Sequence, residues 1–115
     1  MELLKSLLFR ISTFNLFIYL DAKSPMPGIT IYSSMMCGFC HRAKQLLNQK
    51  NLPFDEIDVG LKPGAYQEML KISNGSSSVP QIFIGNTHVG GCDDLFAMDS
   101  SGELDSLLAG SNPAP

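Results

Sequence analysis

The chain has 115 residues, of which 44% are hydrophobic and 17% are charged. This length excludes a multidomain machine, and the composition is that of an ordinary soluble globular domain. The formal net charge of −3 excludes the basic footprint of a nucleic-acid-binding protein, so we expect no nucleic-acid partner. Three cysteines are too few for a disulfide scaffold, and their odd number favours reactive thiols in a reducing compartment. We therefore expect a cytoplasmic protein.

The first 25 residues form the most apolar stretch of the chain. They are too short to span a membrane comfortably, Arg10 interrupts them, and they end in a poor cleavage site for a secretory signal. Three interpretations stay open: a translation start placed too far upstream, an accessory apolar helix, or a targeting segment. We expect residues 1–25 to be an apolar extension outside the fold, residues 26–110 to form the domain, and residues 111–115 to be a flexible tail. We expect no interaction with a membrane.

The apolar pattern after residue 26 predicts alternating strands and helices. Runs of β-branched and aromatic residues predict four strands, over residues 29–32, 54–59, 79–84 and 87–89. Helical spacing predicts helices that begin near Phe39, Pro63 and Cys92, with a last short helix through Leu107 and Leu108. The strand over 54–59 is half polar and is expected at an edge, whereas the strand over 79–84 is apolar on both faces and is expected at the centre. Ser100 and Glu103 have the spacing of a capping box before the last helix.

This order of elements predicts the topology of the sheet. A strand–helix–strand unit closes with parallel strands, whereas the two strands joined by the Gly85-Asn86 turn form an antiparallel hairpin. The result is an α/β domain with a mixed four-stranded sheet flanked by helices, which is a thioredoxin-like fold.

The chemistry of the chain is concentrated in Cys37-Gly38-Phe39-Cys40, at the predicted junction of a loop and a helix. The free N–H groups and the dipole of a helix start favour an anion there, so the Cys37 thiolate is expected to be stabilised. Thiols in such motifs have pKa values of about 3.5–7.5. Cys40 lies deeper in the first turn and is expected to be less acidic. We therefore predict that Cys37 is the attacking thiol and Cys40 the resolving thiol.

The cysteines have three alternative interpretations: a zinc site, a haem attachment site and core packing. A structural zinc site needs a second ligand pair, which Cys92, His41 and His88 do not supply at the right spacing. Cys37 to His41 formally matches the attachment motif of c-type haem, with Met98 as an axial ligand, but the strand-rich context does not favour it. Two buried core cysteines are the third alternative. We interpret four methionines as gap-filling core residues rather than ligands: Met35, Met36, Met69 and Met98.

Three motifs in order carry a family resemblance, over about 80 residues. They are Cys37-Gly-Phe-Cys-His-Arg-Ala-Lys44, Ser78-Val-Pro-Gln-Ile-Phe-Ile84 and Gly90-Gly-Cys-Asp-Asp-Leu95. Together they resemble a bacterial dithiol glutaredoxin with a Cys-Gly-Phe-Cys active site. Thioredoxin itself would show a Trp before its first cysteine, and this chain has no Trp.

The resemblance implies a binding site for glutathione beside Cys37. Val79 and Pro80 resemble the family's cis-proline turn, where the Val79 backbone would pair with glutathione like an added strand. Gly91 and Cys92 would offer N–H groups to the γ-glutamyl carboxylate, and Asp93 would accept the ammonium group. Phe39 would border the glycyl end. For the neighbouring Asp94 we prefer simple helix capping, and Cys92 has an alternative interpretation as a small packing residue at a helix start.

The chain departs from the usual dithiol pattern at several positions. Gly38 replaces the common Pro, Ser34 stands near the position of a frequent Lys, and Ser78 replaces the usual Thr. With fewer positive charges near Cys37, its pKa is expected to be lowered less. The side chains that could compensate are those of Gln67, Arg42 and Lys44.

The resemblance implies a glutathione-dependent thiol–disulfide oxidoreductase that acts through the Cys37 thiolate. Its partners would be glutathione and disulfide-containing or glutathionylated proteins, and it would work as a monomer with no tightly bound cofactor or metal. The alternative is a carrier or sensor of a [2Fe-2S] cluster, in which two copies use Cys37 and two glutathiones as ligands. Gly38 in place of Pro fits this alternative.

Overall fold

The computed structural model describes residues 26–110, and the interpretations of residues 1–25 and 111–115 lie outside the described residues. The described chain forms the strands and helices β1 (Ile29–Ser33), α2 (Gly38–Gln49), β2 (Asp55–Asp58), α3 (Ala65–Ile72), β3 (Gln81–Ile84), β4 (Thr87–Gly90), α4 (Cys92–Ser101) and α5 (Glu103–Leu108). The four strands form one sheet in the order β2-β1-β3-β4. β1 pairs parallel with β2 and antiparallel with β3, and β3 pairs antiparallel with β4. The mixed α/β sheet, the polar edge strand and the central apolar strand are thus confirmed.

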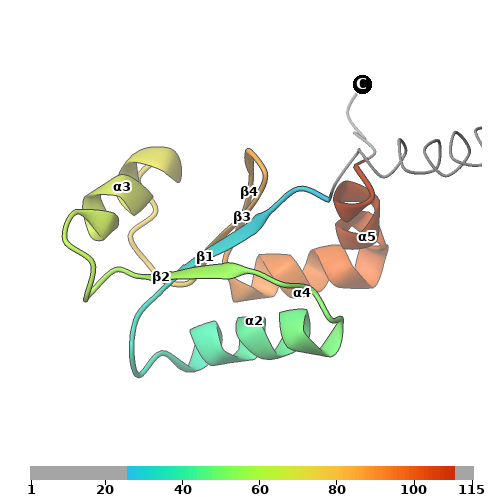
Figure 1. Cartoon of the computed structure of the whole chain (residues 1–115), viewed down its shortest axis with the longest axis horizontal. Coiled ribbons are helices and arrows are strands. Elements are labelled where there is room, and N and C mark those ends of the chain that lie inside the picture. Colours follow the sequence, from blue (N-terminus) through green and yellow to red (C-terminus); the bar gives the residue numbers. More distant parts are fainter. Residues whose placement is uncertain (1–25, 111–115) are drawn as a thin grey trace, which may run out of the picture.

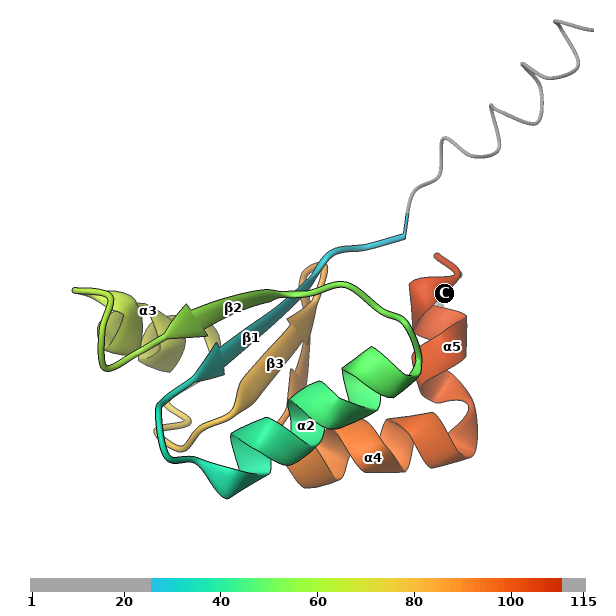
Figure 2. The same cartoon turned by 60° about the horizontal axis from the view of Figure 1, so that its bottom comes forward.

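The helices divide between the two faces of the sheet, with α2 and α4 on one face and α3 on the other (Figure 1). Figure 2 shows α2 and α4 side by side across their face, with α5 at the end of α4. Between this helical layer and the sheet lies the main core, whose buried residues come from β1, β3, α2, α4 and α5. A smaller cluster of Tyr32, Met69 and Phe83 lies under α3 on the opposite face. Side chains alternate between the faces along each strand, so both β1 and β3 contribute to both clusters.

Helix α2 follows its predicted pattern. Its buried residues are Cys40, Ala43, Leu46 and Leu47, which is the apolar face read from the sequence. The helix ends before Asn51, which adopts a left-handed conformation with φ of 58°, as the sequence predicts for an Asn at this position. Because α2 is regular and its apolar face is buried, it fixes the position of Gly38 and of Cys37 before it.

Some of the predicted element ends are wrong. The central strand begins at Gln81 rather than Val79, because Pro80 has no N–H group for the ladder. The capping box predicted for the last helix does not form: Gly102 is its N-cap, with φ of 87°. Ser101, rather than Ser100, supplies the hydroxyl that accepts the Glu103 N–H, at 3.2 Å.

The interpretation of the methionines is only partly right. Met69 is fully buried and Met98 packs against the main core, as expected of gap-filling side chains. Met35 and Met36 are exposed instead, to 67% and 98%. They lie in the loop between β1 and α2. Within residues 26–110, no helix is long and apolar enough to cross a membrane.

Candidate active site

Cys37 and Cys40 lie at the start of α2 and form a disulfide in this structure, with their Cα atoms 5.2 Å apart. Cys37 is the N-cap residue, and its Sγ accepts a hydrogen bond from the Cys40 N–H at 3.1 Å. A thiolate at this place is stabilised by that N–H group and by the helix dipole. Cys40 is 2% exposed, whereas Cys37 is only half buried. An incoming partner therefore reaches the Cys37 sulfur more easily than the Cys40 sulfur.

The turn before β3 lies against the reactive sulfur. The peptide bond between Val79 and Pro80 is cis, in agreement with the turn that the resemblance implies. The Val79 carbonyl oxygen is 3.8 Å from the Cys37 Sγ. The backbone of this turn is therefore placed where a molecule disulfide-bonded to Cys37 would pass along it.

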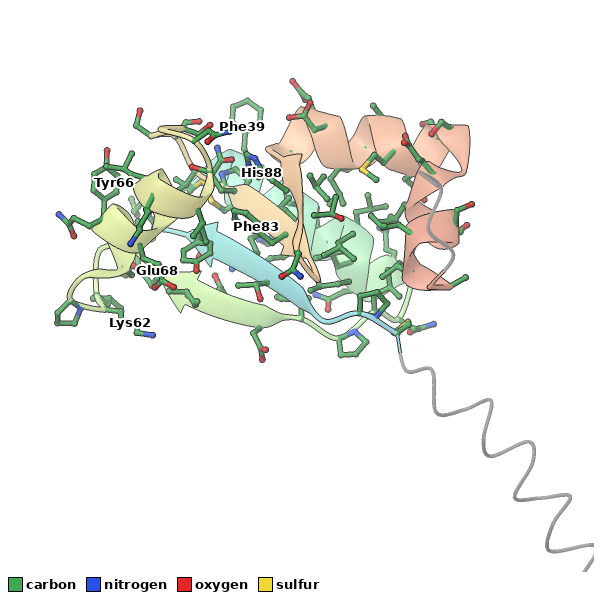
Figure 3. The ribbon with its side chains drawn as sticks, turned by 90° about the horizontal axis from the view of Figure 1, so that it is seen from above. Phe39, Lys62, Tyr66, Glu68, Phe83 and His88 are labelled. Atoms are coloured by element: carbon green, nitrogen blue, oxygen red, sulfur yellow. A yellow bond between two sulfur atoms is a disulfide. The ribbon has the colours of Figure 1, made fainter. Side chains whose placement is uncertain are left out.

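A groove of about 280 Å³ adjoins this turn. Its lining consists of Phe39, Ser78, Val79, Pro80, Gly91, Cys92, Asp93 and Asp94. All six residues predicted to contact glutathione are in this set, although they come from three separate parts of the sequence. We call it the α4 groove, because the first turn of α4 forms one of its walls. The ring of Phe39 is 58% exposed and points outward at its rim (Figure 3).

The N-terminus of α4 differs in one respect from the expected anion site. The Gly91 N–H already donates to the Asp94 carboxylate at 2.9 Å, so Asp94 is a helix cap, as preferred from the sequence. Gly91 lines the groove, but its N–H group is already used in the hydrogen bond to Asp94. The N–H groups of Cys92 and Asp93 lie in the first turn, where no carbonyl of the helix can accept them. The N–H groups of Cys92 and Asp93 are therefore the ones that donate to water or to a bound ligand.

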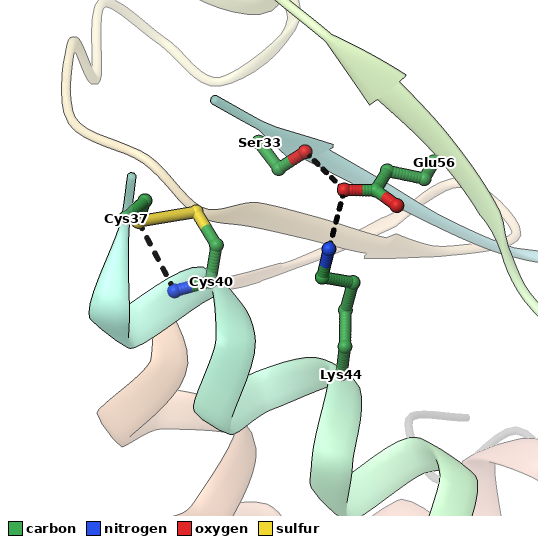
Figure 4. A network of polar contacts seen from close by, with 5 residues as sticks. All are labelled: Ser33, Cys37, Cys40, Lys44 and Glu56. Atoms are coloured by element: carbon green, nitrogen blue, oxygen red, sulfur yellow. Dashed lines mark hydrogen bonds and ion pairs between the residues drawn. A yellow bond between two sulfur atoms is a disulfide. The ribbon is translucent and has the colours of Figure 1, made fainter. Parts of the chain in front are cut away.

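On the other side of Cys37, three polar side chains form the network drawn in Figure 4. The Lys44 ammonium lies 2.7 Å from Glu56 Oε2, and the Ser33 hydroxyl donates to the same oxygen at 2.6 Å. The Lys44 contact foremost, and the Ser33 hydrogen bond after it, hold the pKa of the Glu56 carboxyl below its ordinary value. Lys44 is therefore paired with a carboxylate of its own and does not line the α4 groove.

Arg42 is also engaged away from the α4 groove. Its guanidinium lies over the ring of Phe96, at 5.2 Å from the ring centroid. Gln67 is exposed on α3 and does not line the groove either. None of the three side chains proposed to replace the missing positive charges is thus part of the α4 groove.

A polar link that the sequence patterns did not predict lies behind the Val79-Pro80 turn. Gln81 is 4% exposed, and its side-chain amide donates to the Ser78 carbonyl at 2.9 Å. Its amide oxygen lies 2.6 Å from Nε2 of His88, whose ring stacks on Phe83 (Figure 3). A buried amide needs such partners, since an unpaired one is costly. The signal in the sequence was a lone Gln at the start of an otherwise apolar strand.

Comparisons with known proteins agree with this geometry. Residues 29–89 match the family model described as Glutaredoxin. A glutaredoxin of Pseudomonas aeruginosa is 50% identical over 84 residues, which cover 73% of this chain and 99% of the relative. The chain belongs to the glutaredoxin family. As a family member it is a thiol–disulfide oxidoreductase, with Cys37 and Cys40 as its disulfide-forming pair.

Solved glutaredoxin structures share the fold of this family member. The solution structure of a glutaredoxin from Brucella melitensis has a TM-score of 0.64 and 48% sequence identity, and the match covers 72% of this chain and 89% of that one. The crystal structure of a buckwheat glutaredoxin–glutathione complex has a TM-score of 0.66 and 30% identity, covering 74% and 79%. Family membership favours the redox interpretation of the cysteine pair over the zinc and haem alternatives. Among residues 26–110, no three or more His, Cys, Asp or Glu side chains are grouped so that they could hold a metal ion.

The third cysteine of the glutaredoxin domain is expected to react slowly. Cys92 is buried at the start of α4. Burial raises the pKa of its thiol; the nearby Arg42 charge lowers it in part, and Asp93 raises it further. In the reduced protein at pH 7, we expect iodoacetamide to alkylate Cys92 at least about tenfold more slowly than Cys37, because less of it is thiolate. Mass spectrometry of digested samples over time measures both rates.

The same reaction in urea is the control for the Cys92 prediction, because unfolding exposes all the thiols equally. Equal rates for Cys92 and Cys37 in the folded protein would contradict the prediction and make Cys92 a second reactive thiol.

Proposed function

We propose that the chain is a glutathione-dependent, dithiol thiol–disulfide oxidoreductase, which reduces protein disulfides and protein–glutathione mixed disulfides. The observation that carries this proposal is the α4 groove, whose wall includes a backbone carbonyl 3.8 Å from the Cys37 sulfur. The groove thus adjoins the reacting sulfur, as a site for a thiol tripeptide must. The similarity to the buckwheat glutaredoxin–glutathione complex supports the choice of ligand.

Each part of glutathione has a matching group in the α4 groove. Its cysteine would pair with the main chain of Val79, in the manner of an added strand. Its γ-glutamyl carboxylate would accept N–H groups of Cys92 and Asp93 at the start of α4, where the helix dipole favours an anion. Its ammonium would lie at the exposed Asp93 carboxylate, and Phe39 would border the glycyl end. Pro80, which also lines the groove, would contact the bound tripeptide.

The reaction would proceed by successive thiolate exchanges. The Cys37 thiolate attacks the glutathione sulfur of a mixed disulfide, a new Cys37–glutathione disulfide forms, and the protein thiolate leaves and takes up a proton. A second glutathione thiolate then attacks the adduct, which releases oxidised glutathione and restores Cys37. With a protein disulfide as substrate, Cys40 attacks the Cys37–protein mixed disulfide. The protein is released with its thiols reduced, and the enzyme then carries a Cys37–Cys40 disulfide.

The proposal is tested by a glutathione-coupled assay with glutathione reductase and NADPH. We expect turnover by the wild-type chain, and an increase of about tenfold in KM for the glutathionylated substrate in Asp93→Asn, because one charge-assisted contact is lost. Asp55→Asn is the matched control, since Asp55 is exposed on β2 at the far edge of the sheet. Absence of turnover in the folded wild type, or equal KM values for the two variants, would refute the proposed site.

The alternative function, as a [2Fe-2S] carrier or sensor, is supported by Gly38. This residue is exposed, and a Cβ atom built there would meet no residue beyond its chain neighbours within 4 Å, so the start of α2 is open to a second copy of the chain. One chain offers a single accessible thiolate, so the cluster would need a second copy and glutathione thiolates. Brown colour and a dimer after oxygen-free purification would favour this function, whereas a colourless monomer would favour the oxidoreductase.

For the oxidoreductase we propose the cytoplasm as its compartment.

A further inference from the structure

Two methionines stand out in solvent directly before the reactive cysteine. Met35 is 67% exposed and Met36 is 98% exposed. Met36 also has a φ of 61°, a left-handed conformation that side chains other than Gly, Asn and Asp rarely adopt. Core packing explains neither side chain. We call these two residues the methionine lip.

The methionine lip borders a second cavity, of about 500 Å³, which we call the β2 groove. Cys37 lines it at one end, and the side chains of β2 line it at the other. Its lining contains two carboxylates, of Glu56 and Asp58, and one ammonium, of Lys44, beside the imidazole of His41. Lys44 is already paired with Glu56, so the Asp58 carboxylate leaves the groove with an excess of negative charge. The Asp58 carboxylate accepts the backbone N–H groups of Gly60 and Leu61, both on one of its two oxygens.

The β2 groove and the α4 groove have no lining residue in common. Cys37 lies between them, because it lines the β2 groove and its sulfur contacts the Val79 carbonyl in the wall of the α4 groove. A ligand that fills the α4 groove therefore leaves the β2 groove free. A polypeptide joined to Cys37 by a disulfide can therefore continue from that sulfur over the β2 groove.

We propose that the β2 groove is the docking surface for the polypeptide of a disulfide-containing substrate protein, and that it selects an apolar side chain next to the reacting cysteine and a Lys or Arg beyond it. This inference rests on the proposed function and names its substrate class. Methionine side chains are flexible and polarizable, so the lip accommodates apolar residues of different shapes. The Asp58 carboxylate of the groove attracts the basic residue.

The step that uses this surface is the first exchange with a protein disulfide. The Cys37 thiolate attacks one sulfur of the substrate, a Cys37–substrate disulfide forms, and the second substrate sulfur leaves as a thiolate that takes up a proton. The polypeptide now lies over the methionine lip while the Cys40 thiolate attacks the Cys37 sulfur, a Cys37–Cys40 disulfide forms, and the first substrate sulfur leaves as a thiolate that takes up a proton. Docking stabilises the mixed disulfide against exchange with free glutathione.

The test measures that stabilisation at equilibrium, in the full chain carrying Cys40→Ser. The Cys37–glutathione adduct is exchanged with acetylated, amidated tripeptides Leu-Cys-Lys, Ser-Cys-Lys and Leu-Cys-Glu. Each exchange constant is divided by the constant for exchange of the same peptide with oxidised glutathione. This division removes the differences in thiol acidity between the peptides. We expect Leu to be favoured over Ser about fivefold, from the apolar area buried on the lip. We expect Lys to be favoured over Glu about threefold at low salt, as an exposed ion pair allows.

Three variants locate the preference. Met36→Ser and Met35→Ser are each expected to reduce the Leu preference, and Asp58→Asn to remove the Lys preference, since the Asn oxygen still accepts the loop N–H groups. Met26→Ser is the matched control, because Met26 is an exposed methionine that precedes the opposite end of β1. It is expected to leave all the ratios unchanged.

Each outcome of this test decides between the proposals. Equal constants for the three peptides, or equal effects of Met36→Ser and Met26→Ser, would overturn the docking surface and leave the glutathione reaction intact. Failure of Cys37 to form any adduct with glutathione would overturn the proposed function itself. If light scattering shows a dimer that Met36→Ser dissociates while the peptide ratios do not change, the lip is an interface between two copies of the chain, and the proposal is wrong.

Discussion

Replacing Cys37 by Ser is expected to reduce turnover of a glutathionylated peptide by at least about a thousandfold, as loss of a nucleophile does. Replacing Cys40 by Ser is expected to leave that reaction within about fivefold of wild type and to abolish the catalytic reduction of a protein disulfide. The difference follows from the geometry. Only Cys37 is both accessible and stabilised as a thiolate by the start of α2, whereas Cys40 is buried behind it.

The two cysteine variants are compared in the glutathione-coupled assay, with a glutathionylated peptide and with insulin as the disulfide substrate. Circular dichroism of each reduced variant serves as the control for folding. If Cys40→Ser abolishes deglutathionylation while Cys37→Ser spares it, the assigned roles are reversed. If both variants lose both activities, the reaction needs the pair as a unit rather than a single attacking thiol.

Gly90→Ala is expected to lower the free energy of unfolding by about 2–4 kcal/mol, the sum of a backbone and a capping effect. Gly90 has a φ of 116°, outside the range open to Ala, and a Cβ atom there would collide with the Asp94 carboxylate. That carboxylate caps α4 through the Gly91 N–H, so the helix start would shift. Because the same turn forms a wall of the α4 groove, we also expect a rise in KM for glutathionylated substrates.

Urea unfolding followed by circular dichroism measures the effect of Gly90→Ala. Gly28→Ala is the matched control, because a Cβ atom at Gly28 meets no atom within 4 Å. We expect it to change stability by less than about 0.5 kcal/mol. Equal stability of the two variants would show that the Gly90 conformation is not needed for the cap. An unchanged KM in Gly90→Ala would show that substrate binding in the α4 groove does not depend on the position of the helix start.

Local patterns in the sequence carry most of the fold. The apolar face of α2 and the alternation of buried and exposed residues are periodic, and periodicity can be read from neighbouring residues alone. The element ends were less predictable. Gly102 takes the cap that Ser100 was expected to provide, because the left-handed turn between α4 and α5 depends on how the two helices pack, not on the spacing of hydroxyl groups.

The candidate site was predicted by a different route. The Cys37–Cys40 spacing indicates redox chemistry by itself, since two residues between the thiols allow them to meet across one helical turn. The resemblance supplied the residues of the α4 groove, which no local pattern could have joined. Neither route indicated the Gln81–His88 link or the pairing of Lys44 with Glu56, because each is a contact between different elements whose register only the folded sheet defines.

The sequence by itself therefore determined the class of chemistry and the layered α/β architecture, because the cysteine spacing and the hydrophobic periods are local properties of the chain. Only the tertiary structure decided which groups are free to act. In the folded chain the Gly91 N–H donates to Asp94 and Lys44 pairs with Glu56, whereas Met35 and Met36 lie in solvent close to Cys37. The physical reason is that burial and hydrogen-bond partners depend on residues far apart in the chain, which meet only when the sheet and its helices pack together.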